Sequence, residues 1–116
     1  KVLDYTERIN RYFPCEWKIT IAYDEKDFVI LLDETGKELS SPELAQFIEK
    51  RCMDSGKRVV FVIGGAYGVT QEIKDRADFT WALSKLVFPH EIVRIILSEQ
   101  VYRACTIIRN EKYHHA

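Results

Sequence analysis

The sequence has few cysteines, and their positions exclude the two kinds of site that cysteine most often builds. Cys15, Cys52 and Cys105 are odd in number and widely spaced, and no two of them form a Cys-X-X-Cys pair. A zinc site or a disulfide framework needs several cysteines at close or regular spacing. We therefore expect neither metal nor disulfides, but reduced thiols in a cytoplasmic protein.

Long apolar runs are also lacking. No run approaches the roughly 20 residues that a membrane-spanning helix needs, and Lys1–Asp4 show no signal-peptide pattern. Repeats and low-complexity tracts are missing as well. The 116 residues, 47% hydrophobic and 30% charged, suffice for one packed domain over 1–116 with no membrane partner.

Neither charge dominates, since the formal net charge is −1. The acidic residues gather in residues 24–54, whereas residues 84–115 contain more basic than acidic residues and all three histidines. The C-terminal third is therefore suited to contact a nucleic acid, although the overall charge does not require one.

The stretch around which the chain is organised is an apolar strand that ends in glycine. Val59–Ile63 is an unbroken β-branched and aromatic run, typical of a strand covered on both faces in a parallel sheet. Gly64, Gly65 and Gly68 follow it and allow a backbone or a ligand to approach closely. A tight turn without a ligand explains these glycines equally well.

Other segments alternate between strand and helix patterns. Strands are predicted over residues 16–21, 28–32 and 79–83, with polar loops over 22–27 and 33–39. Helices are predicted over residues 1–12 and from His90 to Arg109. Two further helices are predicted from their caps: one begins at the capping box of Ser40 and Glu43 and ends at a cap at Gly56, and one is capped by Thr70 and runs to Arg76. Such alternation predicts an α/β domain with a mainly parallel sheet and flanking helices.

Three strands run into loops of unusual composition. They end at Leu32, Ile63 and Leu83, and parallel strands bring such ends together at one edge of the sheet. The loop after Leu83, residues 84–90, is largely apolar, so its side chains need a ligand, another loop or a partner subunit to cover them. The stripe of the last helix is also wide enough for a dimer partner.

Four segments together resemble one family. They are residues 62–68 (VIGGAYG), 83–90 (LSKLVFPH), 99–104 (EQVYRA) and the ending Tyr113-His114. In order and spacing they resemble the SPOUT-class methyltransferases that methylate N3 of a pseudouridine in large-subunit ribosomal RNA. The resemblance implies a C-terminal trefoil knot, a homodimer, and S-adenosylmethionine bound in the knot.

The resemblance also implies site residues. It assigns the cofactor contacts to Leu32, Gly64, Leu83, Ser84, Lys85, Leu86, Val87 and Phe88. Those residues lie in the three strand-end loops that the parallel arrangement brings together. An adenine needs an apolar slot with backbone hydrogen bonds, which such loops can supply.

The sequence departs from the family pattern in three places. The family begins with a further strand and has a longer charged connection near residues 21–27, so we expect both segments to be missing from this sequence. The residue after Tyr113-His114 is usually strongly basic, whereas here it is His115, which makes the charge of the tail dependent on pH.

The implied reaction is attack by the pseudouridine N3 on the cofactor's methyl group, on the assembled ribosome and not on DNA. His114 is the candidate base or proton relay, and Tyr113 is suited to stack on the target base. Arg94, Arg103 and His115 are candidates for RNA contact, although both arginines could instead hold the partner subunit. We expect His90 to begin the last helix and Glu99 to pair with a neighbouring arginine.

Three other interpretations remain open. The same fold could methylate another RNA, such as transfer RNA. It could bind the ribosome and the cofactor without methyl transfer. A phosphate-binding protein that uses Gly64 and Gly65 is disfavoured, because no P-loop lysine or serine follows them.

Overall fold

The computed structural model describes residues 2–18, 21–64 and 68–115, apart from the side chains of residues 52 and 53. The chain forms helices α1 (Val2–Ile9), α2 (Ser41–Ile48), α3 (Gln71–Arg76) and α4 (His90–Ile108), the π-helical stretch η1 (Glu49–Asp54), and strands β1 (Phe28–Glu38), β2 (Val59–Ile63) and β3 (Phe79–Ala82). The strands form a parallel sheet in the order β2-β1-β3. The predicted α/β class with a parallel sheet and flanking helices is confirmed, whereas the knot stays a prediction.

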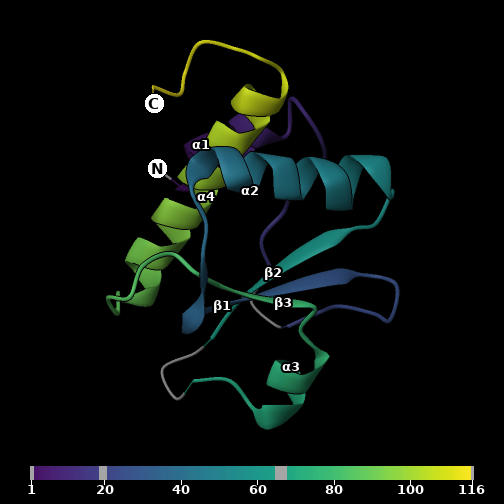
Figure 1. The fold of residues 1–116 in the computed structure, drawn as a ribbon, viewed down its shortest axis with the longest axis vertical. Coiled ribbons are helices and arrows are strands. Elements are labelled where there is room, and N and C mark those ends of the chain that lie inside the picture. The colour runs from purple at the N-terminus through teal and green to yellow at the C-terminus, as the bar shows by residue number, and fades with distance from the viewer. Residues whose placement is uncertain (1, 19–20, 65–67, 116) are drawn as a thin grey trace.

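Helices cover both faces of the sheet, with β1 in the centre (Figure 1). Alternate residues of β1 point to opposite faces, as the pleat requires. Ile30 packs with buried residues of α1, α2 and α4. Val29 and Leu31 pack on the other face with Val62 and with Ile73 of α3. The central strand is therefore buried on both faces, as its unbroken apolar sequence predicts.

The predicted helix caps are confirmed. The Ser40 hydroxyl accepts a hydrogen bond from the Glu43 amide at 3.2 Å, and the Glu43 carboxylate accepts one from the Ser40 amide at 2.8 Å. This reciprocal capping box satisfies two amides that the first turn of a helix leaves unpaired. Thr70 caps α3 through the Ile73 amide at 3.3 Å. Gly56 follows η1 with a φ of 70°, which suits glycine at a helix end.

The strand predicted over residues 16–21 is wrong for residues 16–18 and 21, which lie in no helix or strand; residues 19 and 20 lie outside the described residues. The segment packs on α1 instead of the sheet, because the Trp17 indole donates a hydrogen bond to the Thr6 hydroxyl at 2.9 Å. The Cys15 amide likewise donates to the Asn10 side chain. An alternating pattern fits a strand only where a sheet edge is available to pair with it.

The polar loop predicted over residues 33–39 is also wrong, because β1 continues to Glu38. Leu32 and Lys37 both align with Trp81, so the residues between them bulge out before pairing with β3 resumes. Gly36 lets the two backbones approach, since a Cβ there would lie 2.6 Å from the carbonyl carbon of Thr80. Helix boundaries differ less: α1 ends at Ile9 instead of Tyr12, and α4 begins at His90 as predicted.

Among the helices within the described ranges, none is both long enough and apolar enough to span a bilayer.

Candidate functional site

The carboxyl ends of β2 and β3 lie on either side of Leu32, which is within β1. Leu32 aligns with Ile63 of β2 on one side and with Trp81 of β3 on the other. Gly64 and Leu83 directly follow these neighbouring strands. The predicted convergence is therefore confirmed for the ends of β2 and β3, whereas the predicted end of β1 at Leu32 is wrong, because β1 continues to Glu38. The edge where β2 and β3 end is where open α/β sheets bind ligands.

Gly64 lies where the chain after β2 returns on itself. A Cβ at this position would lie 3.0 Å from a methyl group of Val69. Gly65 is outside the described residues, whereas Gly68 has a φ of 80°, a conformation that favours glycine. The absence of a side chain at Gly64 lets Val69 pack closely against its backbone.

The loop between β3 and α4 presents apolar side chains to solvent. Leu86 is 68% exposed and Val87 is 77% exposed. The Ser84 hydroxyl accepts a hydrogen bond from the Leu86 amide at 3.1 Å, which holds the turn. Phe88 is half-buried and Lys85 is exposed. Two neighbouring large apolar side chains that are exposed to water are typical of a surface that a ligand or another chain covers.

The tail residues are held by α4. The Tyr113 hydroxyl donates a hydrogen bond to the Glu99 carboxylate at 3.1 Å, and the Glu99 carboxylate pairs with Arg103 at 2.8 Å. The predicted pairing of Glu99 with an arginine is confirmed. Burial, together with the hydrogen bond to Glu99, raises the pKa of Tyr113 to about 12. The Arg103 guanidinium lies 4.9 Å from the centre of the Tyr113 ring.

His114 faces Arg103 as well. Its Nδ1 lies 3.2 Å from Nη1 of Arg103. A guanidinium has no acceptor, so Arg103 donates and Nδ1 accepts. The neutral ring then carries its proton on Nε2, which is buried and has no partner among the described residues. In this arrangement His114 can donate a hydrogen bond from Nε2, while Nδ1 is occupied by Arg103.

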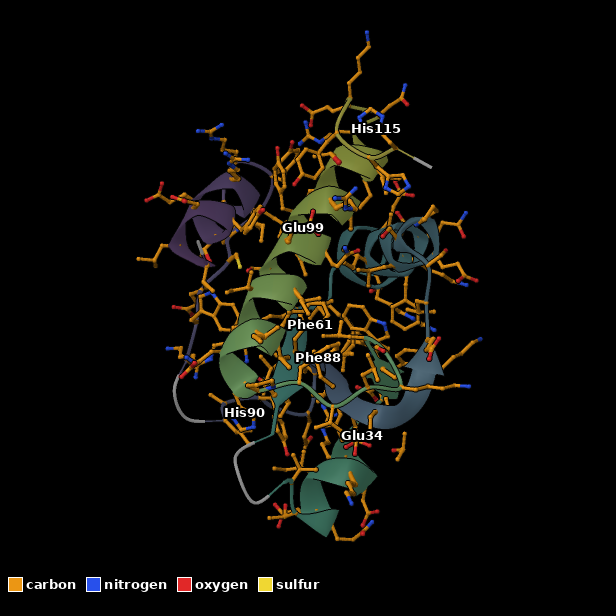
Figure 2. All side chains as sticks on the ribbon, turned by 90° about the vertical axis from the view of Figure 1, so that its left-hand side faces the viewer. Glu34, Phe61, Phe88, His90, Glu99 and His115 are labelled. Carbon is orange, nitrogen blue, oxygen red and sulfur yellow. The ribbon has the colours of Figure 1, made fainter. Side chains whose placement is uncertain are left out.

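The predicted cofactor residues and the predicted catalytic residues lie at opposite ends of α4. Figure 2 shows Phe88 and His90 at one end and His115 at the other. The 19 residues of α4 span about 28 Å. Arg94 and His115 are exposed, whereas Arg103 is engaged by Glu99 and His114. Within one chain, therefore, the structure does not bring His114 to the strand-end edge.

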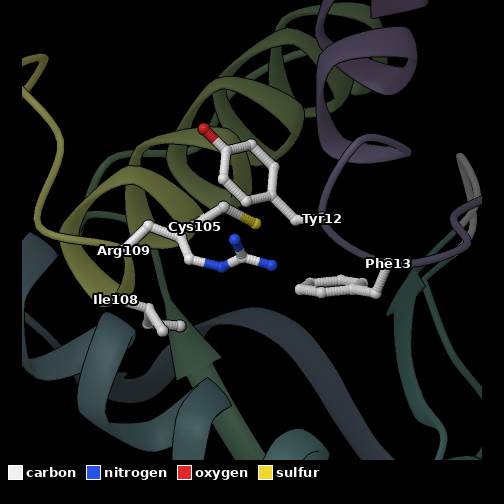
Figure 3. Close-up of a pocket in the computed structure, with 5 residues that line it drawn as sticks. All are labelled: Tyr12, Phe13, Cys105, Ile108 and Arg109. Carbon is white, nitrogen blue, oxygen red and sulfur yellow. The ribbon is translucent and has the colours of Figure 1, made fainter.

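A second group of residues was missed in the sequence. A hollow of about 530 Å³ lies between α1 and the end of α4, and is here called the arginine hollow; it is lined by Arg8, Arg11, Tyr12, Tyr102, Arg109 and Glu111. Next to it Arg109 lies against Tyr12, Phe13 and Cys105 in a small cavity (Figure 3). The available signal was the close spacing of Arg8, Arg11 and Tyr12 at the start of the chain.

Comparison with known proteins gives a consistent set of relatives. A sequence model of the family described as "Predicted SPOUT methyltransferase" matches residues 6–114. A protein of Christiangramia forsetii named "Ribosomal RNA large subunit methyltransferase H" is 52% identical over 97 residues, which are 84% of this chain and 62% of that protein. Proteins of the same name from Geobacter metallireducens and Geobacter sulfurreducens are 44% and 43% identical, over 97% of this chain and 86% of each relative. The match thus spans less than two thirds of the first relative.

Proposed function

The chain belongs to the SPOUT methyltransferase family, and from this premise we propose that it methylates N3 of a pseudouridine in large-subunit (23S) ribosomal RNA, on the assembled ribosome in the cytoplasm. The observation that carries the proposal is the identity of 43 to 52% to proteins named as large-subunit ribosomal RNA methyltransferases. The methyl donor that we propose is S-adenosylmethionine.

The strand-end edge fits this cofactor. Gly64 follows β2 and carries no side chain, and Leu86 and Val87 expose apolar side chains that an adenine could cover. Leu32, Gly64 and residues 83–88 would hold the cofactor, which supplies an activated methyl group on a sulfonium. The contribution of these residues is to orient the methyl group toward the target nitrogen and to exclude water.

We propose that the enzyme is a homodimer. One argument is the distance of about 28 Å along α4 between the cofactor residues and the tail. A second copy in the opposite orientation would place its tail near the strand-end edge of the first. The other argument is the exposure of apolar residues around the start of α4; these are Leu86, Val87, Ile92 and Ile95.

The described contacts of His114 support a third role beside base and proton relay, that of a hydrogen-bond donor. With Nδ1 facing Arg103, the Nε2 proton can stabilise the anion that forms when pseudouridine loses the N3 proton, once RNA binding uncovers this buried nitrogen. A role as base would require release from Arg103. We assign contact with the target base to Tyr113, RNA contacts to the exposed Arg94 and His115, and the orientation of His114 to Arg103.

We propose that the whole protein is longer than this sequence. The Geobacter alignments run over 136 and 135 positions, more than the 116 residues present here. The relatives therefore contain residues with no counterpart in this chain. We propose a further strand before α1 and a longer connection near residues 21–27.

The test is transfer of labelled methyl from S-adenosylmethionine to ribosomes that lack the modification, with the modified nucleotide mapped by mass spectrometry. Free ribosomal RNA and transfer RNA serve as competing substrates. Label on N3 of a pseudouridine in assembled ribosomes is the expected result. Label on transfer RNA would replace the proposal with another RNA substrate, and cofactor binding without transfer would indicate a binding module.

A variant pair tests the tail in the same assay. We expect His114→Ala to lower kcat at least tenfold while cofactor binding stays within about twofold, because the anion loses a donor. His115→Ala is the matched control, since His115 is exposed, and should mainly change KM for the ribosome. Equal effects of both variants would contradict the assignment to His114.

A further inference from the structure

The arginine hollow carries positive charge that the protein does not neutralise. Of its charged residues, Arg8, Arg11 and Arg109 are cationic and only Glu111 is anionic. The Glu111 carboxylate accepts a hydrogen bond from the Tyr12 hydroxyl. Among the described residues, none of the three guanidinium groups is in an ion pair, although other arginines of the chain are.

Two of the arginines are held in place by aromatic rings instead of carboxylates. The Arg8 guanidinium lies 5.5 Å from the centre of the Tyr102 ring and 5.9 Å from that of Tyr5. The Arg109 guanidinium lies 5.5 Å from the centre of the Tyr12 ring (Figure 3). Contact with a ring face restrains a guanidinium but leaves its N–H edges free to donate. Such an edge matches two oxygens of a phosphate.

The hollow is continuous with the tail. Tyr102 lines the hollow. The centre of its ring lies 4.8 Å from the centre of the Tyr113 ring and 6.4 Å from that of the Tyr12 ring, and both pairs are edge-on. Tyr113 is the residue next to His114. An RNA strand whose target base lies on the tail would therefore pass over the arginine hollow on the same side of the molecule.

We infer that the arginine hollow binds the phosphate backbone of the substrate RNA, through Arg8, Arg11 and Arg109. The inference rests on the proposed function for the identity of the RNA. Surfaces that bind a nucleic-acid backbone typically combine arginines that are not in ion pairs with neighbouring aromatic rings, as this hollow does. Because phosphate contacts carry no sequence information, the hollow would set the position and affinity of the RNA, while the tail addresses the target base.

The test compares two triple variants of equal charge change. Arg8→Gln/Arg11→Gln/Arg109→Gln removes the three cations of the hollow. Lys26→Gln/Lys50→Gln/Lys74→Gln removes three cations from exposed positions outside the hollow's lining. Binding to ribosomes that lack the modification is measured at several salt concentrations. We expect the arginine variant to bind at least about tenfold more weakly, with a salt slope smaller by about 2, since each lost phosphate contact lowers the slope by roughly 0.7 to 0.9. The lysine variant should stay within about twofold.

Arg11→Glu keeps the inference testable if the triple variant fails to fold. Arg11 is exposed and makes no side-chain hydrogen bond or ion pair with the other described residues, so its replacement breaks no such contact. It should weaken ribosome binding without lowering the melting temperature. Equal binding by the arginine and lysine variants would overturn the inference. So would loss of self-association in the arginine variants by sedimentation, because the hollow would then be a protein interface.

The assay separates this inference from the proposed function. Ribosome binding is measured without methyl transfer, so a chain that binds ribosomes but transfers no methyl group refutes the proposed function alone. The comparison of the two variants still decides the role of the hollow. If the unaltered chain does not bind ribosomes, the inference is overturned.

Discussion

The phenol of Tyr113 donates a hydrogen bond to the carboxylate of Glu99 across 14 positions of the sequence, at 3.1 Å. The same carboxylate oxygen accepts from Arg103 at 2.8 Å. One acidic side chain of α4 thereby fixes both the last tyrosine and the arginine that faces His114. The orientation of the tail depends on Glu99.

Removing the charge of Glu99 should lower the pKa of Tyr113. Burial is the larger cause of its rise to about 12, and the hydrogen bond and charge of Glu99 add to it. In Glu99→Gln we therefore expect a pKa between about 10 and 12, because burial persists. Phenolate absorbance during a pH titration measures it, and Tyr113→Phe identifies the signal. Glu91→Gln, in the exposed first turn of α4, should leave the pKa unchanged.

The same shift predicts how stability changes at alkaline pH. A pKa that is higher in the folded than in the unfolded state stabilises the fold fully below about 10, and this contribution is lost as the pH rises toward about 12. Tyr113→Phe should flatten the pH dependence of the unfolding free energy in this window. The hydrogen bond with Glu111 likewise raises the pKa of Tyr12 to about 12. Tyr12→Phe should therefore also flatten the pH dependence of the unfolding free energy in this window. Identical profiles for the unaltered chain and both variants would refute the assignment.

Asp27 fixes the start of the sheet. Its side chain is 5% exposed and accepts hydrogen bonds from Arg58, with Nε at 3.0 Å, and from the Asp24 amide at 2.9 Å. Arg58 directly precedes β2, and its carbonyl accepts from the Phe28 amide of β1 at 2.9 Å. The hydrogen bonds from Arg58 hold the pKa of Asp27 below its usual value.

Asp27→Asn should lower the free energy of unfolding at neutral pH by about 2 kcal/mol, since a buried, hydrogen-bonded charge is replaced by an amide that donates toward Arg58. A lowered folded pKa stabilises the protein above the unfolded value of about 3.9, and this contribution is lost as the pH falls through the folded value. The variant should therefore lose less stability below about pH 4. Urea unfolding at several pH values measures both effects. Asp54→Asn, an exposed position, is the control, and an equal response from both variants would rule out the role of Asp27.

The parts of this fold that were predictable depend on local signals. The apolar run Val59–Ile63, the Ser40 capping box and the Thr70 cap each specify their element within a few residues. The alignment of Leu32 with Ile63 and Trp81 follows from parallel pairing alone. Family resemblance, not periodicity, supplied the cofactor and the reaction.

The parts that were missed depend on distant partners. Residues 33–38 read as a polar loop, because the pairing of Lys37 with Trp81 cannot be seen in the local sequence. The segment 16–18 alternates like a strand but packs on α1 through Trp17. The arginine hollow joins Arg8, Arg11 and Tyr12 with residues about a hundred positions later, so the close spacing of these three residues could not reveal it alone.

Among the glycines that the structure describes, Gly36 is predicted to be the least tolerant of a side chain. In Gly36→Ala the new Cβ would lie 2.6 Å from the carbonyl of Thr80 and 2.8 Å from the Trp81 amide nitrogen, and neither backbone group can move without separating β1 from β3. We expect a loss of about 2 to 4 kcal/mol in the free energy of unfolding. Gly56→Ala is the control, because a Cβ there meets open space and only its φ of 70° costs about 1 kcal/mol. A smaller loss for Gly36→Ala than for Gly56→Ala would show that β1 and β3 are not in this register.

A double variant at Gly64 and Val69 separates the contribution of Gly64 to packing from its contribution to cofactor binding. In Gly64→Ala the closest atom to the new methyl group is a methyl group of Val69, at 3.0 Å, and that side chain can give way, while the Gly68 backbone is at ordinary contact distance. We expect a stability loss below about 1 kcal/mol but a loss of S-adenosylmethionine affinity of at least tenfold, because in our proposal the cofactor approaches the backbone beside this methyl group. Gly64→Ala/Val69→Ala removes the contact with Val69 and should restore stability without restoring affinity, as measured by thermal unfolding and calorimetric titration. If the double variant binds the cofactor like the unaltered chain, Gly64 serves only to pack its loop, and the strand-end edge is not where the cofactor approaches the backbone.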